Sequence, residues 1–238
     1  MARPNKLLIV VTGDPPPAVA ERFGSYADIM AAAVGPAWAG AYASVDPRSE
    51  PPRSAADTAG IIITGSSASL PAEEPWMATA ATWLAEMIQR DIPTLGVCFG
   101  HQLVALALGG RVAPNPRGRE MGTVSVERLA DSELLAGLDR QFSVNACHTD
   151  TVSDLPPGAV VVARSALDPH QCVRFAERCF GVQFHPELDG HKMRAFVDAR
   201  APLIRCEGLS PEAIRASARD TPSGTRILQN FVQRFVAD

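Results

Sequence analysis

The sequence predicts an α/β protein in which helices cover both faces of a mostly parallel sheet. Three observations support this fold class: short apolar runs rich in β-branched residues, helical periodicity between two of them, and turn residues at their ends. The runs are Lys6–Val11, Gly60–Gly65 and Ile92–Cys98, and Pro75–Arg90 carries the helical pattern. Strands that alternate with helices form parallel sheets whose sites lie at the carboxyl ends of the strands.

The first half of the chain is expected to supply the parallel strands. The run KLLIVV (Lys6–Val11) ends at Thr12-Gly13-Asp14, so it is interpreted as a buried strand that enters a loop. Between the second and third runs, apolar residues fall on one helical face, at Trp76, Ala80, Trp83 and Met87. These segments together predict a strand, a helix and a strand.

The second half adds one more helix near the third run and several further strands. A helix is expected over His101–Leu108, because the glycine pair that follows is typical of a helix C-cap. Further strands are expected at residues 123–126, 142–144, 160–163 and 180–184. Helices are expected from about Pro211, with an apolar stripe that docks on the core, at Ile227, Phe231 and Phe235. We expect one domain over residues 1–238, with 192–238 as a helical extension.

The composition excludes several classes of protein. The chain has 238 residues, of which 46% are hydrophobic and 20% charged, values that argue against a disordered chain. The net charge is −4 and no long basic run occurs, so we expect no nucleic-acid partner. No apolar run approaches the roughly 20 residues of a membrane span. Residues Met1–Lys6 show no signal-peptide core, so we expect a cytoplasmic protein without a membrane partner.

The sequence also argues against metals and nucleotide cofactors. Its five cysteines, an odd number without C-x-x-C spacing, predict neither a disulfide framework nor a zinc knuckle. His101, His170 and His191 have no metal-ligand spacing, and neither a P-loop nor a G-x-G-x-x-G fingerprint is present. We therefore expect no cofactor and no metal site.

Cys98 is the strongest candidate for a catalytic residue. It is the central residue of Gly96-Val97-Cys98-Phe99-Gly100, directly after an apolar strand and before a predicted helix, which is the nucleophile-elbow pattern with sulfur in place of a serine oxygen. The helix N-terminus favours the thiolate, and the Phe99 N–H would face a developing oxyanion. The alternative is a small buried apolar residue, but the elbow context favours the nucleophile.

A base for this nucleophile is expected in Phe184-His185-Pro186-Glu187, which follows a later apolar run. Residues i and i+2 of an extended segment point to the same side, so Glu187 can orient the His185 ring and stabilise its imidazolium. A lone histidine is more often structural, but one with a carboxylate two residues on is a plausible general base. Cys147 and His148 are adjacent and should face opposite ways, so they do not predict a second dyad.

The segments GVCFGHQ (Gly96–Gln102) and GVQFHPE (Gly181–Glu187) resemble the class I glutamine amidotransferases. The resemblance covers about Lys6 to His191, and it implies a flavodoxin-like three-layer sandwich. It further implies that Cys98 attacks the side-chain amide of glutamine to form a γ-glutamyl thioester, with His185 as proton shuttle and Glu187 as its support. The expected products are glutamate and ammonia.

The resemblance also implies residues around the triad. Gly65 matches the oxyanion loop of the family and acts with the Phe99 amide, although Ser66 and Ser67 replace the usual glycine and proline. The residues expected to bind the glutamyl group are Gln102, Ser66, His148 and Asp150. Of these, His148 and Asp150 belong to a segment that resembles the Ser-His-Gly-Asp pocket wall, and a structural turn is an equal alternative for them.

Several functions remain open at this point. The resemblance is greatest to stand-alone members called GMP-synthase-like, which implies that glutamine is the substrate and that a separate synthase subunit receives the ammonia. Plant γ-glutamyl peptidases are similar too, so hydrolysis of γ-glutamyl peptides is the principal alternative. A non-catalytic sensor or binding subunit is another alternative, but all three triad positions are retained. A cysteine α/β-hydrolase would place its acid between Cys98 and His185, unlike this chain.

Overall fold

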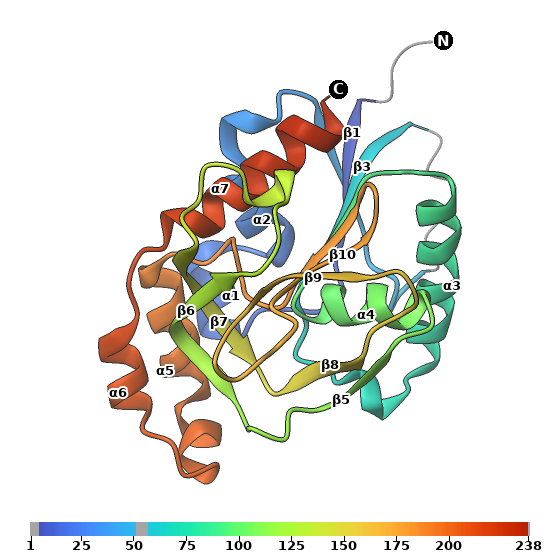
Figure 1. The fold of residues 1–238 in the computed structure, drawn as a ribbon. Helices are drawn as coiled ribbons and strands as arrows, with labels where there is room; N and C mark the ends of the chain where they lie inside the picture. Colours follow the sequence, from blue (N-terminus) through green and yellow to red (C-terminus); the bar gives the residue numbers. More distant parts are fainter. Residues whose placement is uncertain (1–4, 51–56, 238) are drawn as a thin grey trace.

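One central sheet organises the fold, and it has nine strands among the residues that the computed structural model describes, 5–50 and 57–237 (Figure 1). Residues 1–4, on which part of the localisation argument depends, lie outside this set. Parallel strands build one half of the sheet, in the order β2 (Ala41–Val45), β1 (Lys6–Val10), β3 (Thr58–Ile63), β4 (Thr94–Val97) and β11 (Cys179–Val182). The expected strands at the first, second and third apolar runs are therefore confirmed.

Antiparallel strands continue the sheet beyond β11. They follow in the order β10 (Cys172–Ala176), β9 (Val160–Arg164), β6 (Glu120–Arg128) and β7 (Gln141–His148). A separate two-stranded sheet pairs β5 (Arg111–Pro114) with β8 (Asp150–Asp154). The sequence located apolar runs in this half, but their antiparallel pairing depends on contacts between distant segments.

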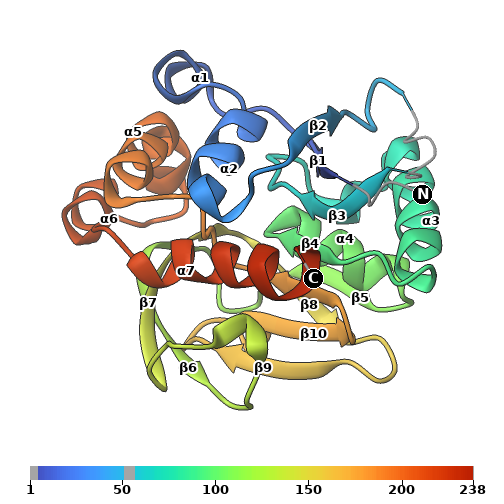
Figure 2. The same ribbon diagram turned by 90° about the horizontal axis from the view of Figure 1, so that it is seen from above.

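Helices cover both faces of the sheet, as Figure 2 shows from above. On one face, α2 (Tyr26–Val34) and α7 (Pro222–Phe231) pack against the strands. On the other face lie α3 (Pro75–Gln89) and α4 (Phe99–Ala107). A third cluster joins α1 (Pro17–Phe23), α5 (Gly190–Cys206) and α6 (Pro211–Ser217) beside α2. The predicted α/β fold class with helices on both faces is confirmed.

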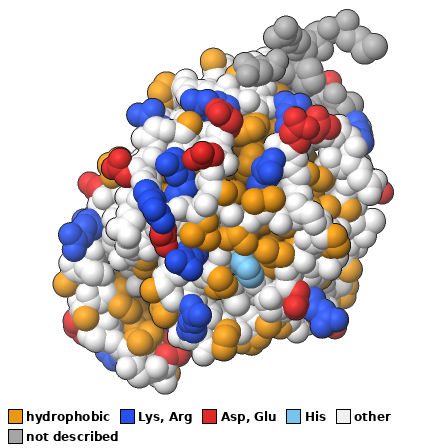
Figure 3. All heavy atoms as spheres, in the orientation of Figure 1, with side chains coloured by type: hydrophobic (Ala, Val, Ile, Leu, Met, Phe, Trp, Pro, Cys, Tyr) orange, Lys and Arg blue, Asp and Glu red, His pale blue; other side chains and the backbone are white. Residues whose placement is uncertain are grey.

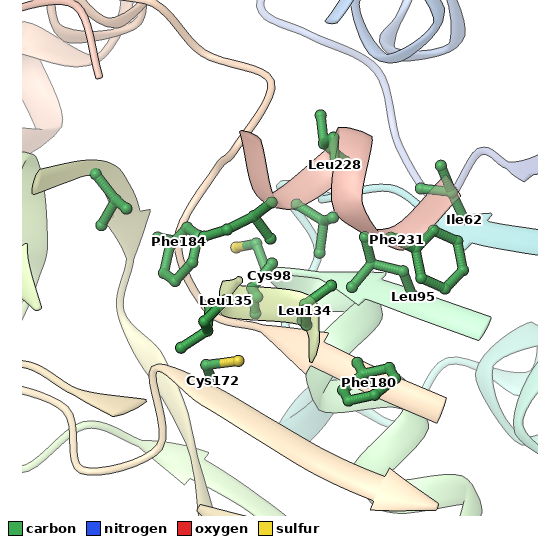
Figure 4. Packing of buried hydrophobic residues seen from close by; sticks show 14 of the residues in the cluster. Ile62, Leu95, Cys98, Leu134, Leu135, Cys172, Phe180, Phe184, Leu228 and Phe231 are labelled. Carbon is green, nitrogen blue, oxygen red and sulfur yellow. The ribbon is translucent and has the colours of Figure 1, made fainter. Parts of the chain in front are cut away.

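The apolar residues of α7 explain why the end of the chain packs on the sheet. Phe231 lies beside Ile62 and Leu95 of the parallel strands, and Leu228 belongs to the same buried cluster (Figure 4). Ile227 and Phe231 are fully buried, and Phe235 packs against the ring of Phe180 at 4.8 Å between centroids. The predicted docking stripe is thus confirmed. The outer face in Figure 3 mixes hydrophobic with charged side chains, in contrast to this apolar interior.

Local signals mark where several helices begin. Ser25 and Asp28 form a reciprocal capping box that starts α2, and Asp189 caps the first turn of α5 by accepting from the Lys192 N–H at 2.7 Å. The helix α4 begins at Phe99, earlier than predicted, because Cys98 itself occupies the N-cap position. None of the helices within the described residues is both long and apolar enough to cross a membrane.

Close packing between α4 and β3 leaves no room for a side chain at Gly100. A Cβ at this position would lie 2.5 Å from the backbone oxygen of Ile63, so Gly100→Ala requires α4 to move away from the sheet. We expect a loss of about 2–4 kcal/mol in the free energy of unfolding, measured in urea. The matched control is Gly118→Ala, where a side chain has open space and only the positive φ of 80° opposes it. We expect this variant to lose about 1 kcal/mol in the free energy of unfolding. Equal losses in both variants would contradict this packing argument.

Candidate active site

The sequence-predicted residues meet where β3, β4 and β11 end. Cys98 follows β4 and His185 lies just beyond β11, and the two strands are parallel neighbours with Val97 opposite Val182. Gly65 follows β3, on the other side of β4. Since parallel strands end at the same edge of a sheet, their loops bring residues from three distant segments together.

Cys98 occupies a sharp turn between β4 and α4. Its backbone has a φ of 52°, which is rare for a residue with a side chain, and its N–H donates to the Val182 carbonyl at 2.8 Å. The strained conformation is the kind of outlier found at functional sites. The side chain is 6% exposed, and its thiol lies 3.8 Å from the Cys147 carbonyl oxygen.

His185 is held between the thiol and a carboxylate. Its Nδ1 lies 2.7 Å from Oε1 of Glu187, and its ring lies close enough to the Cys98 thiol for each group to shift the pKa of the other. Both His185 and Glu187 are almost fully buried. The backbone N–H of His185 donates to the Asn145 carbonyl on β7 at 2.7 Å, which fixes the segment against the sheet. The three predicted triad residues therefore form a contiguous chain of side chains.

Electrostatics favour a thiolate beside an imidazolium in this arrangement. Burial opposes the charge on the Cys98 sulfur, but the charge and hydrogen bond of His185 outweigh burial and lower the pKa of the thiol. Burial likewise opposes a charged His185 ring, but Glu187 and Cys98 raise its pKa well above the ordinary value. Each group thus stabilises the charged form of the other.

The loop at Gly65 lies directly beside this pair. A Cβ at Gly65 would be 2.8 Å from Cε1 of His185 and 3.6 Å from Cβ of Cys98, so a side chain there would collide with the His185 ring. On the other side, Phe99 is the first residue of α4, where a helix leaves its N–H groups without intrahelical partners. The two backbone segments named by the sequence as oxyanion donors therefore flank Cys98.

His148 is buried in a polar cluster behind the thiol. Its Nε2 lies 3.0 Å from Oε2 of Glu120, and its Nδ1 lies 3.0 Å from the Asp150 carbonyl oxygen. A backbone carbonyl and an ionised carboxylate both accept hydrogen bonds, so this arrangement favours a ring with a proton on each nitrogen. Burial opposes that charge, but the Glu120 hydrogen bond and the charges of Cys98 and Asp168 raise the pKa of His148. The imidazolium in turn lowers the pKa of Cys98.

A cavity of about 140 Å³ opens beside Cys98 and is lined by the residues expected to bind the substrate: Ser66, Gln102, His148 and Asp150. The side-chain amide of Gln102 donates to the Asp150 carbonyl at 2.9 Å and to Oε1 of Gln183 at 3.0 Å. The Asp150 carboxylate accepts a hydrogen bond from the Ser69 hydroxyl at 2.6 Å. This donor is distant in the sequence and is not a backbone N–H of a local turn. A larger cavity, of about 900 Å³, lies at the opposite end of β4, near Pro93.

Two arginines that the sequence analysis did not identify also line the small cavity. Arg119 precedes β6, and Arg200 lies on α5. Neither belongs to a motif with a fixed sequence distance from Cys98. Arg119 reaches the cavity from the start of β6, and Arg200 reaches it from α5. Within the described ranges, no cluster of three or more metal-ligating side chains occurs.

The fold and this site define an α/β protein with a cysteine at a strand-to-helix elbow beside a histidine–glutamate pair. The sequence model of the family "Glutamine amidotransferase class-I" matches residues 38–198. The chain therefore belongs to the class I glutamine amidotransferase family, as its motifs imply.

Curated relatives match over about half of the chain. A glutamine-hydrolyzing GMP synthase of Thermomicrobium roseum is 44% identical over 129 residues, which are 54% of this chain and 23% of that protein. A glutamine-hydrolyzing GMP synthase subunit of Pyrococcus abyssi is 40% identical over 41% of this chain and 52% of its own length. The corresponding protein of Methanosarcina acetivorans is 34% identical over 56% and 66%. The matched segment thus spans less than two thirds of each of these relatives.

Solved structures agree in fold over nearly the whole chain. A glutamine amidotransferase from Thermotoga maritima superimposes with a TM-score of 0.80 at 21% identity, covering 100% of both chains. A glutamine amidotransferase from Methylobacillus flagellatus gives a TM-score of 0.74, also at 21% identity, over 99% of this chain and 95% of its own. At this identity the likeness concerns the fold.

Proposed function

We propose that this chain hydrolyses the γ-amide of glutamine to glutamate and ammonia, with Cys98 as nucleophile. The observation that carries the proposal is the contiguous arrangement of Cys98, His185 and Glu187, with 2.7 Å between Nδ1 of His185 and the Glu187 carboxylate. Family membership supports glutamine as the substrate. The lowered pKa of the Cys98 thiol supports a thiolate as the attacking group.

In the proposed first step, the Cys98 thiolate attacks the amide carbon and a tetrahedral oxyanion forms. Backbone N–H groups of Phe99 and of the loop at Gly65 stabilise this oxyanion. The His185 imidazolium gives its proton to the amide nitrogen, the carbon–nitrogen bond breaks, and ammonia leaves a γ-glutamyl thioester on Cys98. Glu187 keeps the ring oriented and offsets its positive charge.

In the second step, neutral His185 takes a proton from water, and the resulting hydroxide attacks the thioester carbon. The carbon–sulfur bond breaks, glutamate is released, and Cys98 returns as thiolate beside protonated His185. We further propose that the ammonia passes to a separate synthase subunit, because two of the relatives above are named as glutamine-hydrolyzing subunits of GMP synthase.

Glutamate release by the purified chain tests the proposed substrate. We expect hydrolysis of glutamine, alone or after a synthase partner is added, and slower release from γ-glutamyl dipeptides. Rapid cleavage of dipeptides with little turnover of glutamine would contradict the proposal and favour a γ-glutamyl peptidase. No turnover of either substrate with any partner would favour a non-catalytic binding subunit.

A further inference from the structure

Two arginines line the small cavity beside Cys98, and one of them has no carboxylate partner within the described residues. The two are Arg119 and Arg200. The guanidinium of Arg119 forms two hydrogen bonds to the Glu207 carboxylate, at 2.5 and 2.7 Å, and its side chain is 6% exposed. Glu207 therefore neutralises Arg119. Arg200 has no such partner among the described residues.

The half-buried Arg200 makes one side-chain hydrogen bond, from Nη2 to the Ser67 hydroxyl at 2.9 Å. Its Nε is buried from solvent and has no hydrogen-bond partner, and no carboxylate in the described part of the chain forms an ion pair with it. Charged groups at low exposure are normally paired, because the loss of hydration is otherwise uncompensated. A guanidinium is also well shaped to bind a carboxylate with two parallel hydrogen bonds. Arg200 is thus a vacant partner for an anion.

The opposite charge is present on the same cavity wall. Asp150 lines it with a carboxylate that, within residues 5–50 and 57–237, only the Ser69 hydroxyl is seen to contact. Gln102 uses its amide hydrogens on the protein, so its oxygen remains the group available for a ligand. The cavity therefore offers acceptors to an ammonium group and Arg200 to a carboxylate. This pattern complements the zwitterionic end of an amino acid.

We propose that Arg200 binds the free α-carboxylate of the substrate. This rests on the proposed function and deepens it: the site takes γ-glutamyl compounds with an unblocked amino-acid end, and excludes glutamine residues inside a peptide chain. The cavity volume of about 140 Å³ is below the roughly 300–1,000 Å³ of sites for drug-sized ligands, which favours a ligand as small as an amino acid. Arg200 lies on α5, just beyond residues 38–198 that the family model matches.

Binding to the Cys98→Ala protein tests this inference without requiring turnover. Calorimetric titration with L-glutamine and with its α-methyl ester compares ligands that differ at the α-carboxylate. We expect glutamine to bind roughly 10- to 100-fold more tightly than the ester, as for a charged hydrogen-bonded pair. Adding Arg200→Met should abolish this preference, and Arg200→Lys should restore part of it. The matched control is Arg205→Met on the same helix, at an exposed arginine that pairs with Glu212.

Three outcomes would overturn the inference. One is an unchanged preference for glutamine in Arg200→Met. The second is an equal loss of affinity for both ligands, reproduced by Ser67→Ala, since Arg200 would then act only by holding the loop. The third uses γ-glutamyl-glycine and γ-glutamyl-methylamide: if Arg200→Met weakens only the former, the bound carboxylate belongs to the leaving group. A wild-type chain that never hydrolyses glutamine but keeps the Arg200-dependent preference would refute the proposed function alone.

Discussion

Replacing His185 with asparagine is expected to lower kcat for glutamine by about 10³- to 10⁵-fold. Asparagine fits the space, but it can neither donate a proton to leaving ammonia nor accept one from water. The substitution also removes the cation that lowers the pKa of Cys98, while burial, which raises it, remains. The thiol should therefore ionise at a higher pH in the variant than in the wild-type chain.

The pH dependence of alkylation measures this second effect independently of turnover. In the wild-type chain, the lowered pKa keeps Cys98 as thiolate to a lower pH than an ordinary cysteine, so iodoacetamide should react with it below about pH 8. In His185→Asn the profile should move to higher pH, as followed by mass spectrometry of the Cys98 peptide. The exposed Cys206 is the internal reference, and His191→Asn is the matched control. A kcat within tenfold of wild type would contradict the assigned role.

Replacing Cys98 with alanine should have the largest effect, the loss of all measurable glutamine hydrolysis. Alanine keeps the Cβ, so the turn between β4 and α4 and the packing of Phe99 are preserved, while the sulfur that attacks the amide is removed. The thermal unfolding midpoint is expected to stay near that of the wild type. Cys206→Ala, at an exposed cysteine, should leave both activity and stability unchanged.

The candidate triad could be predicted because each part of it has a local signature. The elbow at Cys98 needs glycines on both sides, and Gly100 lies so close to Ile63 that the structure explains the requirement. His185 and Glu187 are two residues apart, and their side chains point to the same side and meet in a hydrogen bond. The relation between the two segments followed from a parallel sheet, in which β4 and β11 are neighbours.

The surroundings of the triad could not be predicted in the same way. Glu120 raises the pKa of His148, and the two residues meet because they are opposite each other in the register of β6 and β7. Arg200 reaches the cavity through the packing of α5, which no short motif encodes. The capping box of Ser25 and Asp28 is a local sequence pattern that indicates the start of α2. The antiparallel half of the sheet has no such local pattern, because it depends on pairing between distant segments.

The proposed mechanism depends on transfer of a γ-glutamyl group to the sulfur of Cys98. Intact-protein and peptide mass spectrometry of the wild-type chain, acid-quenched during turnover of glutamine, tests it most directly. We expect a mass increase of one γ-glutamyl group on the peptide that contains Cys98, and no adduct in Cys98→Ala. Undiminished glutamate release by Cys98→Ala, or an adduct on another residue of the active wild-type chain, would contradict it.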